Sequence, residues 1–126
     1  MSIFGIGIDI VQIDRVQRSV EKHGEIFAKK ILHNNELAIF NQHQHPHRYL
    51  AKRFAAKEAF AKALGTGIVE GVTLPRIEIV NDSDGKPALV LHGATEVMVK
   101  NKGVKSMFLA ITDEQDYAVA QVVLEA

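Results

Sequence analysis

The apolar positions at the start of the chain follow the pattern of a strand. From Ile3 to Val11 the residues are mostly β-branched and apolar, and Gly5 and Gly7 interrupt the run. This composition predicts a buried first strand. Glycines inside a strand mark a bulge or the close approach of another segment, so we expect one of these features here.

Helical patterns follow this strand. Asp14 is the predicted N-cap of a helix that continues to about Lys22, and Gly24 lies just beyond its end. A second helix is predicted to begin at Asn34 or Asn35, because asparagine is a favoured N-cap residue.

The clearest helical segment covers roughly residues 47–64 and ends at Gly65. It is rich in alanine, which favours a helix and allows another segment to pack closely against it. Its larger apolar residues share one broad side, so we expect this helix to be buried: Leu50, Phe54, Phe60, Ala61 and Leu64.

The second half of the chain has the pattern of two hairpins. Residues 76–80 pair with 88–91 across a polar turn, and residues 106–112 pair with 117–124. A short helix over 95–102 lies between the hairpins. The order β-α-α-α-β-β-α-β-β predicts one α+β domain over residues 1–126, with a largely antiparallel sheet, one long buried helix and shorter helices.

Composition narrows the class of protein. The 126 residues are 47% hydrophobic, which is enough for a core, and the absence of cysteine excludes disulfides, thiolate metal sites and a cysteine nucleophile. Fifteen cationic and fifteen anionic residues give no net charge, so we expect no nucleic-acid or membrane partner. We find neither a secretory signal nor the roughly 20-residue apolar run that spans a bilayer, and expect a cytoplasmic protein.

The charge is unevenly distributed along the chain. Residues 15–30 hold five cations and two anions, residues 48–62 hold five cations and one anion, and residues 113–126 hold four anions and no cation. The basic blocks predict a positive surface that attracts phosphates or an acidic protein. The alternative is that they are solvated helix faces without a ligand.

Asp9 is the one charged residue between Met1 and Gln12, and its neighbours are mostly isoleucine and glycine. A carboxylate in such a run is unfavourable unless it is paired or bound to a cation. A functional role is therefore one interpretation of Asp9. The other is an exposed strand end, where the carboxylate meets water or caps a turn.

Glu58 is the one acid among the five cations of the long helix. Lys62 follows it by four residues, which is the spacing of a helical ion pair. Glu58 also follows Phe54 by one turn, at the edge of the apolar side, where it could hold a divalent metal ion. Two carboxylates from separate elements together with phosphate oxygens are a usual Mg²⁺ site, but no local pattern brings Asp9 and Glu58 together.

Other motifs are weaker. Gly5-Ile6-Gly7 is only half of a dinucleotide fingerprint. His43, His45 and His47 match no closed zinc site, so we interpret them as solvated loop histidines. The Gly65-Thr66-Gly67 segment could present backbone N–H groups to a phosphate, although a helix end also explains its glycines.

Two separated motifs resemble the holo-acyl-carrier-protein synthase family, the 4′-phosphopantetheinyl transferases of bacterial fatty-acid synthesis. The similarity extends over essentially the whole chain, including the Gly85-Lys86-Pro87 turn and the closing strand from Tyr117 to Val123. The segments that carry it are GIGIDIV at 5–11, followed by Arg15, then RFAAKEAFAKA at 53–63 and GTGI at 65–68.

The resemblance implies a reaction and its partners. Enzymes of this family transfer the phosphopantetheine arm of coenzyme A to a serine of apo acyl carrier protein and release adenosine 3′,5′-bisphosphate. The resemblance further implies Mg²⁺ as the cofactor and a homotrimer with active sites between adjacent subunits. The acidity of acyl carrier proteins would explain the basic blocks of the chain.

The resemblance also implies roles for individual residues. Asp9 and Glu58 match the two magnesium-binding carboxylates, and Lys62 matches the lysine beside the transferred phosphate. The residues expected to bind substrate are Arg53, Lys57, Gly65 and Lys86. The residues expected to dock the carrier protein lie on the first helix and are Arg15, Arg18 and Lys22.

Three points stay open at this level. Many members of the family carry histidine where this chain has Asp113, so no catalytic role passes to that position. The base for the serine proton is either a metal-bound water or Glu58. The alternative function is a non-catalytic module that binds a nucleotide or an acidic protein through the same basic blocks.

Overall fold

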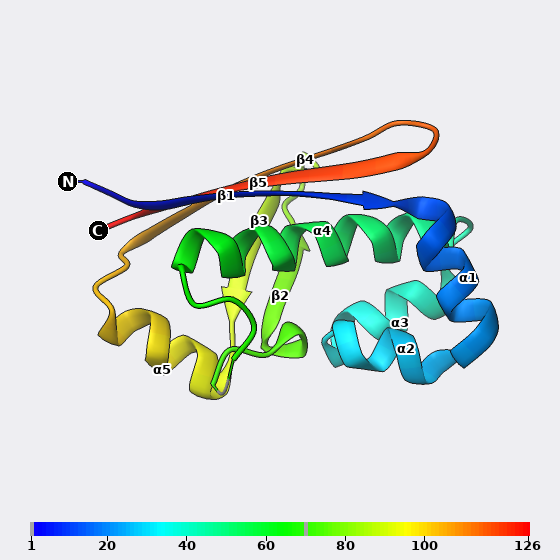
Figure 1. The fold of residues 1–126 in the computed structure, drawn as a ribbon, viewed down its shortest axis with the longest axis horizontal. Helices are drawn as coiled ribbons and strands as arrows, with labels where there is room; N and C mark the ends of the chain where they lie inside the picture. Colours follow the sequence, from blue (N-terminus) through cyan, green and yellow to red (C-terminus); the bar gives the residue numbers. More distant parts are fainter. Residues whose placement is uncertain (1, 70) are drawn as a thin grey trace.

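The computed structural model describes residues 2–69 and 71–126, and all its strands are antiparallel. β1 (Ile3–Gln12), β5 (Tyr117–Glu125) and β4 (Ser106–Asp113) form a three-stranded sheet in the order β1-β5-β4. β2 (Ile77–Asn81) and β3 (Pro87–Leu91) form a separate hairpin (Figure 1). The α+β class is confirmed, but the expected single sheet is divided into two.

The helices are α1 (Ile13–His23), α2 (Glu25–Ile31), α3 (Asn34–Gln42), α4 (Pro46–Leu64) and α5 (Gly93–Asn101), with a 3₁₀ turn η1 (Leu74–Arg76). The sequence patterns did not predict α2, because seven residues are too few to show a periodic apolar side. Asp14 is not the N-cap of α1 as predicted. Gln12 takes that position, and Asp14 lies in the first turn.

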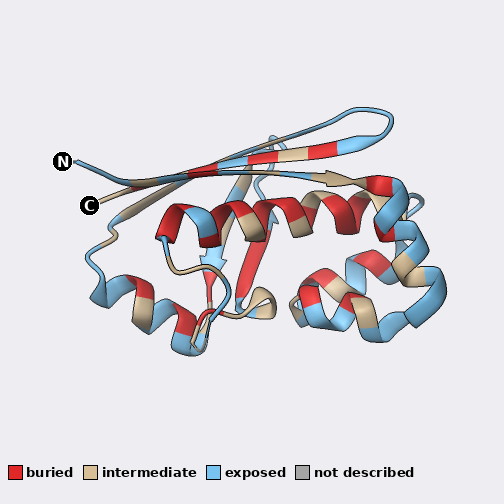
Figure 2. Cartoon of the chain, viewed as in Figure 1, coloured by how far each residue is buried: buried red, intermediate tan, exposed pale blue. Residues whose placement is uncertain are grey.

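The long helix α4 lies beneath the three-stranded sheet and forms the centre of the molecule (Figures 1 and 2). Leu50, Phe60, Ala61 and Leu64 are buried as predicted, and Phe54 is half-buried. One core cluster lies between the C-terminal part of α4, the sheets and α5, and a second lies between its N-terminal part and α1, α2 and α3.

The prediction of a buried first strand is wrong for its isoleucine side chains. Ile6, Ile8 and Ile10 are exposed by 56%, 59% and 61%. The glycines explain the reversal, because a Cβ placed on Gly5 or Gly7 would lie 1.9 Å from a carbonyl oxygen of α4. The glycine face of β1 therefore packs directly on α4, and the isoleucine face is left outside. The expected close approach is confirmed, and a register irregularity between Ile3 and Gly5 accompanies it.

The smaller helices cover the two ends of this arrangement. α1, α2 and α3 gather around the N-terminal end of α4, whereas α5 lies toward the opposite end, as Figure 1 shows. Within residues 2–69 and 71–126, no helix combines the length and apolar character that a bilayer span requires.

Candidate active site

Asp9 and Glu58 lie at one cavity of about 400 Å³ between β1, α1 and α4. Asp9 comes from the middle of β1, on the same face as the two glycines, and so points toward α4. Glu58 lies on the adjoining part of α4, and Arg15 of α1 also lines the cavity. The tertiary structure thus brings together the two carboxylates that the sequence left apart.

The charges in this cavity are coupled. Partial burial raises the pKa of Glu58, the negative charge of Asp9 raises it further, and Lys62 opposes both effects. The Lys62 ammonium donates to Asp9 Oδ1 at 2.9 Å and to the backbone oxygen of Ile8 at 3.1 Å. Among the ion pairs of the described residues, Lys62 therefore pairs with Asp9 across two elements and not with Glu58 along the helix.

The spacing of small residues fixes this geometry. Gly7 rests on Ala59 and Ala63 of α4, so β1 crosses the helix at the closest distance that two backbones allow. Asp9 follows Gly7 by two residues on the same face of the strand. The glycines therefore determine how far the Asp9 carboxylate lies from the helix that carries Glu58 and Lys62.

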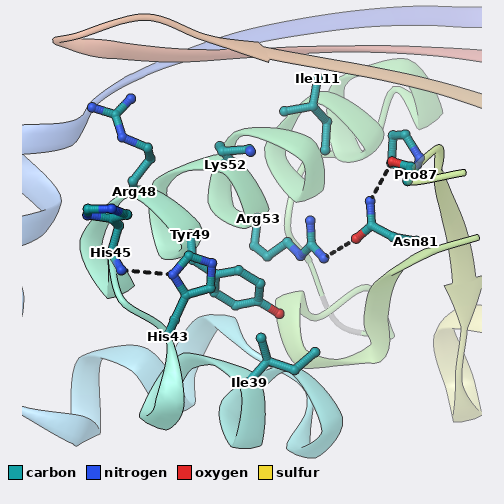
Figure 3. Close-up of a pocket in the computed structure, with 11 residues that line it drawn as sticks. Ile39, His43, His45, Arg48, Tyr49, Lys52, Arg53, Asn81, Pro87 and Ile111 are labelled. Atoms are coloured by element: carbon teal, nitrogen blue, oxygen red, sulfur yellow. Dashed lines mark hydrogen bonds between the residues drawn. The ribbon is translucent and has the colours of Figure 1, made fainter. Parts of the chain in front are cut away.

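A second cavity, of about 370 Å³, lies among α3, the N-terminal half of α4 and the β2–β3 turn, and is strongly basic (Figure 3). Three cations of α4 line it: Arg48, Lys52 and Arg53. The sequence predicted Arg53 as a substrate-binding residue but did not single out Arg48 and Lys52. Their spacing of four residues within the basic block was the signal that could have identified them.

Arg53 is largely buried in the wall of this basic cavity. Its guanidinium donates to Asn81 Oδ1 at 2.7 Å and lies over the Tyr49 ring, 4.7 Å from the centroid (Figure 3). These contacts hold the guanidinium plane in one position, because one Nη is hydrogen-bonded and the face of the group lies against the ring. Arg53 is thus a fixed cation at the cavity and remains a candidate for a phosphate.

Asp113 contacts two of the cations that line this cavity. It accepts a hydrogen bond from Arg48 at 2.8 Å and lies 3.7 Å from the Lys52 ammonium. Arg48 further donates to the backbone oxygens of Glu114 and Gln115. These hydrogen bonds and ion pairs therefore hold the acidic β4–β5 turn against the basic N-terminal part of α4.

Lys57 does not bind substrate in the way the sequence suggested. Its side chain is fully buried, and its ammonium donates to Glu36 Oε1 at 2.5 Å and to the backbone oxygen of Ile31 at 2.6 Å. Burial lowers the pKa of Lys57 to about 8, although Glu36 opposes the shift. We therefore correct the expectation: Lys57 belongs to the core, where it joins α2, α3 and α4.

Gly65 and Lys86 lie outside both cavities. The Gly65 N–H donates to the backbone oxygens of Ala61 and Lys62 at the C-cap of α4, so this amide is already hydrogen-bonded within the chain. Lys86 is exposed in the β2–β3 turn and lines a hollow beside Phe108 on β4. The structure of one chain does not bring either residue to Asp9 and Glu58.

The three predicted docking residues lie exposed on α1. Arg15, Arg18 and Lys22 follow at spacings of three and four residues and share one face of the helix. Arg18 forms an ion pair with Asp14 within the helix. Arg15 is the one of the three that also lines the carboxylate cavity.

Comparisons with known proteins identify the family of this chain. Residues 5–122 match the family model of the 4′-phosphopantetheinyl transferase superfamily. The chain is 49% identical, over all 126 residues and the full length of both proteins, to the holo-[acyl-carrier-protein] synthase of Vibrio parahaemolyticus.

Solved structures of related proteins share the fold of this chain. The holo-[acyl-carrier-protein] synthase of Neisseria meningitidis is 45% identical, with a TM-score of 0.95 over 98% of this chain and 99% of that chain. The synthase of Bacillus anthracis, solved in complex with CoA (3′,5′-ADP), is 37% identical, with a TM-score of 0.84 over 100% of this chain and 99% of that chain. The chain therefore belongs to the 4′-phosphopantetheinyl transferase superfamily, among the holo-[acyl-carrier-protein] synthases that attach phosphopantetheine to apo acyl carrier protein.

Proposed function

We propose that residues 1–126 act as one domain that moves 4′-phosphopantetheine from coenzyme A to a serine of apo acyl carrier protein, with Mg²⁺, and releases adenosine 3′,5′-bisphosphate. The convergence of Asp9 and Glu58 at one cavity, with Lys62 paired to Asp9, is the observation that carries the proposal. The related synthase of Bacillus anthracis in complex with CoA supports coenzyme A as the donor.

The residues at the carboxylate cavity fit a magnesium ion. Asp9 and Glu58 offer hard oxygen ligands from two separate elements, and burial together with the repulsion between the two negative charges raises the pKa of Glu58. A divalent cation would relieve this repulsion. When bound, Mg²⁺ supplies positive charge that neutralises pyrophosphate oxygens during phosphoryl transfer.

Lys62 and Glu58 have further proposed roles in the transfer. The Lys62 side chain is 55% exposed and paired with Asp9, so its flexible ammonium can turn to a phosphate bound beside Asp9. Glu58 and a water bound to the metal are the two candidates for accepting the serine proton. The serine oxygen then forms a bond to the phosphorus attached to pantetheine, and the bond from that phosphorus to the bisphosphate leaving group breaks.

The basic cavity supports a site for the nucleotide phosphates. Arg53 is held there by Asn81 and Tyr49, and Arg48 and Lys52 add two further cations. This cavity shares no lining residue with the carboxylate cavity. We therefore propose that the basic cavity of one subunit meets the carboxylates of its neighbour, so that the active site is shared between subunits.

The outer face of the three-stranded sheet supports this assembly. Ile6, Ile8 and Ile10 of β1 are exposed, and Phe108 of β4 is exposed by 54%. The pairing register aligns Ile6 and Phe108 across Val123 of β5, so these side chains form one apolar surface. An exposed apolar face of this kind marks an interface, and we propose that it is the core of a homotrimer.

The exposed cations of α1 support docking of the carrier protein. Arg15 lies both on the outer face of α1 and at the carboxylate cavity, so a bound carrier protein would present its serine beside Asp9 and Glu58. Arg18 and Lys22 extend the positive face away from the cavity. Such a face speeds the encounter with an acidic protein and fixes its orientation.

A mass assay tests the transfer and the carboxylate site. Apo acyl carrier protein, coenzyme A and Mg²⁺ are mixed with the enzyme, and the phosphopantetheine mass on the carrier is measured. We expect Asp9→Asn and Glu58→Gln each to reduce transfer at least about 10²-fold, while Glu96→Gln, an exposed carboxylate of α5, is fully active. Full transfer by the first two variants would refute the two-carboxylate site, and no transfer by any protein would favour a binding module.

A charge reversal tests the docking surface. We expect Arg15→Glu to raise the KM for carrier protein much more than the KM for coenzyme A, because the reversed charge repels the acidic partner. Lys100→Glu on α5 makes the same change of charge elsewhere and serves as the control. Equal effects of the two variants on the carrier-protein KM contradict a docking role for α1.

A further inference from the structure

Three side chains with metal-ligand chemistry meet at a place that the transferase mechanism does not use. His33 precedes α3, Glu78 lies in β2, and His92 lies between β3 and α5. His92 Nε2 is 2.8 Å from Glu78 Oε1, and His33 Nδ1 is 3.8 Å from the same oxygen. One ligand atom from each residue lies within 4.8 Å of the others.

Glu78 is the buried member of this group. Its side chain is almost entirely buried, and Oε2 accepts a hydrogen bond from Asn35 Nδ2 at 3.1 Å, so Oε1 faces the two imidazoles. Burial alone would raise the pKa of Glu78, but the hydrogen bonds from His92 and Asn35 hold it below its usual value.

We propose that His33, Glu78 and His92 form a binding site for a divalent transition-metal ion, for which Zn²⁺ is the probe. Two imidazole nitrogens and one carboxylate oxygen are a known zinc ligand set, with water completing a tetrahedral shell. Magnesium and calcium prefer all-oxygen shells, so this ligand set selects against the cation proposed for the carboxylate cavity. The proposal does not depend on the proposed function.

The surroundings provide space for the ion and its water. A cavity of about 390 Å³ is lined by both histidines, at the junction of α2, α3, η1 and the segment that leads into α5. Lys29 and Arg76 line the same cavity, and their positive charges oppose a cation. We therefore expect micromolar affinity and not the far tighter binding of a closed zinc site.

Binding requires a small rearrangement of the histidines. Their rings are stacked, with centroids 4.3 Å apart and planes at 19°, so one ion cannot lie in both ring planes as they stand. His33 is the ring that can turn, because it is partly exposed and its Nδ1 only accepts the Asn35 N–H at the start of α3. The metal would then replace the proton between His92 and Glu78.

The site would join segments that are distant in the sequence. His33 follows α2 and caps α3, whereas Glu78 and His92 flank the β2–β3 hairpin. An ion at this junction would cross-link the α2–α3 segment to the hairpin. Because the ion binds only the folded arrangement, it should raise the midpoint temperature of unfolding in proportion to its saturation.

Zinc titration of the whole protein tests the site. Chelator-treated protein is titrated with Zn²⁺ in millimolar Mg²⁺, which competes with Zn²⁺ for all-oxygen sites, and heat release and thermal unfolding are measured. We expect one zinc per chain and a rise in Tm of about 5–10 °C when Zn²⁺ exceeds its Kd about a hundredfold. Cobalt substitution should give the intense visible absorption of a four-coordinate site.

Matched variants assign the ligands. His33→Asn keeps a good N-cap for α3 and removes the imidazole, and His92→Gln keeps a group that can hydrogen-bond to Glu78. We expect each to lower zinc affinity at least about tenfold and to abolish the cobalt band, with Tm in the absence of metal little changed for His33→Asn.

The competing zinc ligands are the histidines between α3 and α4. The double variant His43→Asn/His45→Asn should bind zinc like the original protein. Loss of binding in that variant alone, unchanged affinity in His33→Asn and His92→Gln, or no stoichiometric binding in the original protein would each overturn the proposal.

Discussion

The contact between Gly7 and α4 offers the most direct test of how the fold positions the active site. In Gly7→Ala, the new Cβ would lie 1.9 Å from the Ala59 carbonyl oxygen and 2.6 Å from the Ala63 nitrogen. Both obstacles are backbone atoms of the central helix, which cannot turn away as a side chain can. Carbon–oxygen contacts shorter than 3.0 Å essentially do not occur, so β1 must move from α4 by about 1.1 Å.

This movement is expected to reduce both the stability of the fold and the rate of transfer. Overpacking of this kind costs about 1–3 kcal/mol of folding free energy, or roughly 4–10 °C in Tm for a chain of this length. Asp9 follows Gly7 by two residues and moves with the strand, away from Glu58. A displacement of about 1 Å costs on the order of 10²-fold in rate, equivalent to about 2.7 kcal/mol of activation free energy.

The assay must separate these two losses. Transfer of phosphopantetheine to apo carrier protein is measured at saturating substrates and Mg²⁺, well below the Tm of the variant, so that only folded protein is compared. Gly103→Ala is the control, because its φ of 90° strains alanine while the space around it is open. We expect Gly103→Ala to lose about 1–2 kcal/mol of stability and to keep its kcat. If Gly7→Ala retains the original kcat, the strand does not set the carboxylate geometry.

Three further predictions concern other parts of the molecule. In metal-free protein at pH 7, Glu58→Gln should raise Tm, because a raised carboxyl pKa means that stability is lost as pH rises through it. The difference should shrink toward pH 4, and a lower Tm for the variant at pH 7 would contradict the assigned repulsion. Lys57→Met should destabilise the fold by about 3–5 kcal/mol, because it leaves the Glu36 carboxylate buried without its ammonium, and adding Glu36→Gln should restore part of the loss. Urea unfolding measures the free energy of unfolding of the single and the double variant. A Lys57→Met variant as stable as the original protein would refute the expected cost of the unpaired Glu36 carboxylate. Ile8→Arg should dissociate the oligomer without unfolding the subunit, as light scattering would show, and an unchanged mass would exclude the isoleucine face as the interface.

Local pattern predicted much of the chain because the signals for these elements lie within a few residues. The alanine-rich segment before Gly65 forms α4, and the hairpins lie where alternating residues flank polar turns. α2 was missed because seven residues contain too little periodicity to distinguish a helix from a loop. Asp9 and Glu58 could be singled out because each is an isolated acid in an unusual setting.

The sequence by itself thus determined the order of elements, the family motifs and the two candidate carboxylates. The tertiary structure alone decided which faces are buried and which charges meet. Nothing near Lys57 in the sequence indicates that it pairs with Glu36, and nothing near Ile8 indicates that its strand turns the isoleucines outward. Burial and pairing depend on contacts between segments that are far apart in the sequence. In this protein the backbone contact of Gly5 and Gly7 with α4 determines which face of β1 is buried.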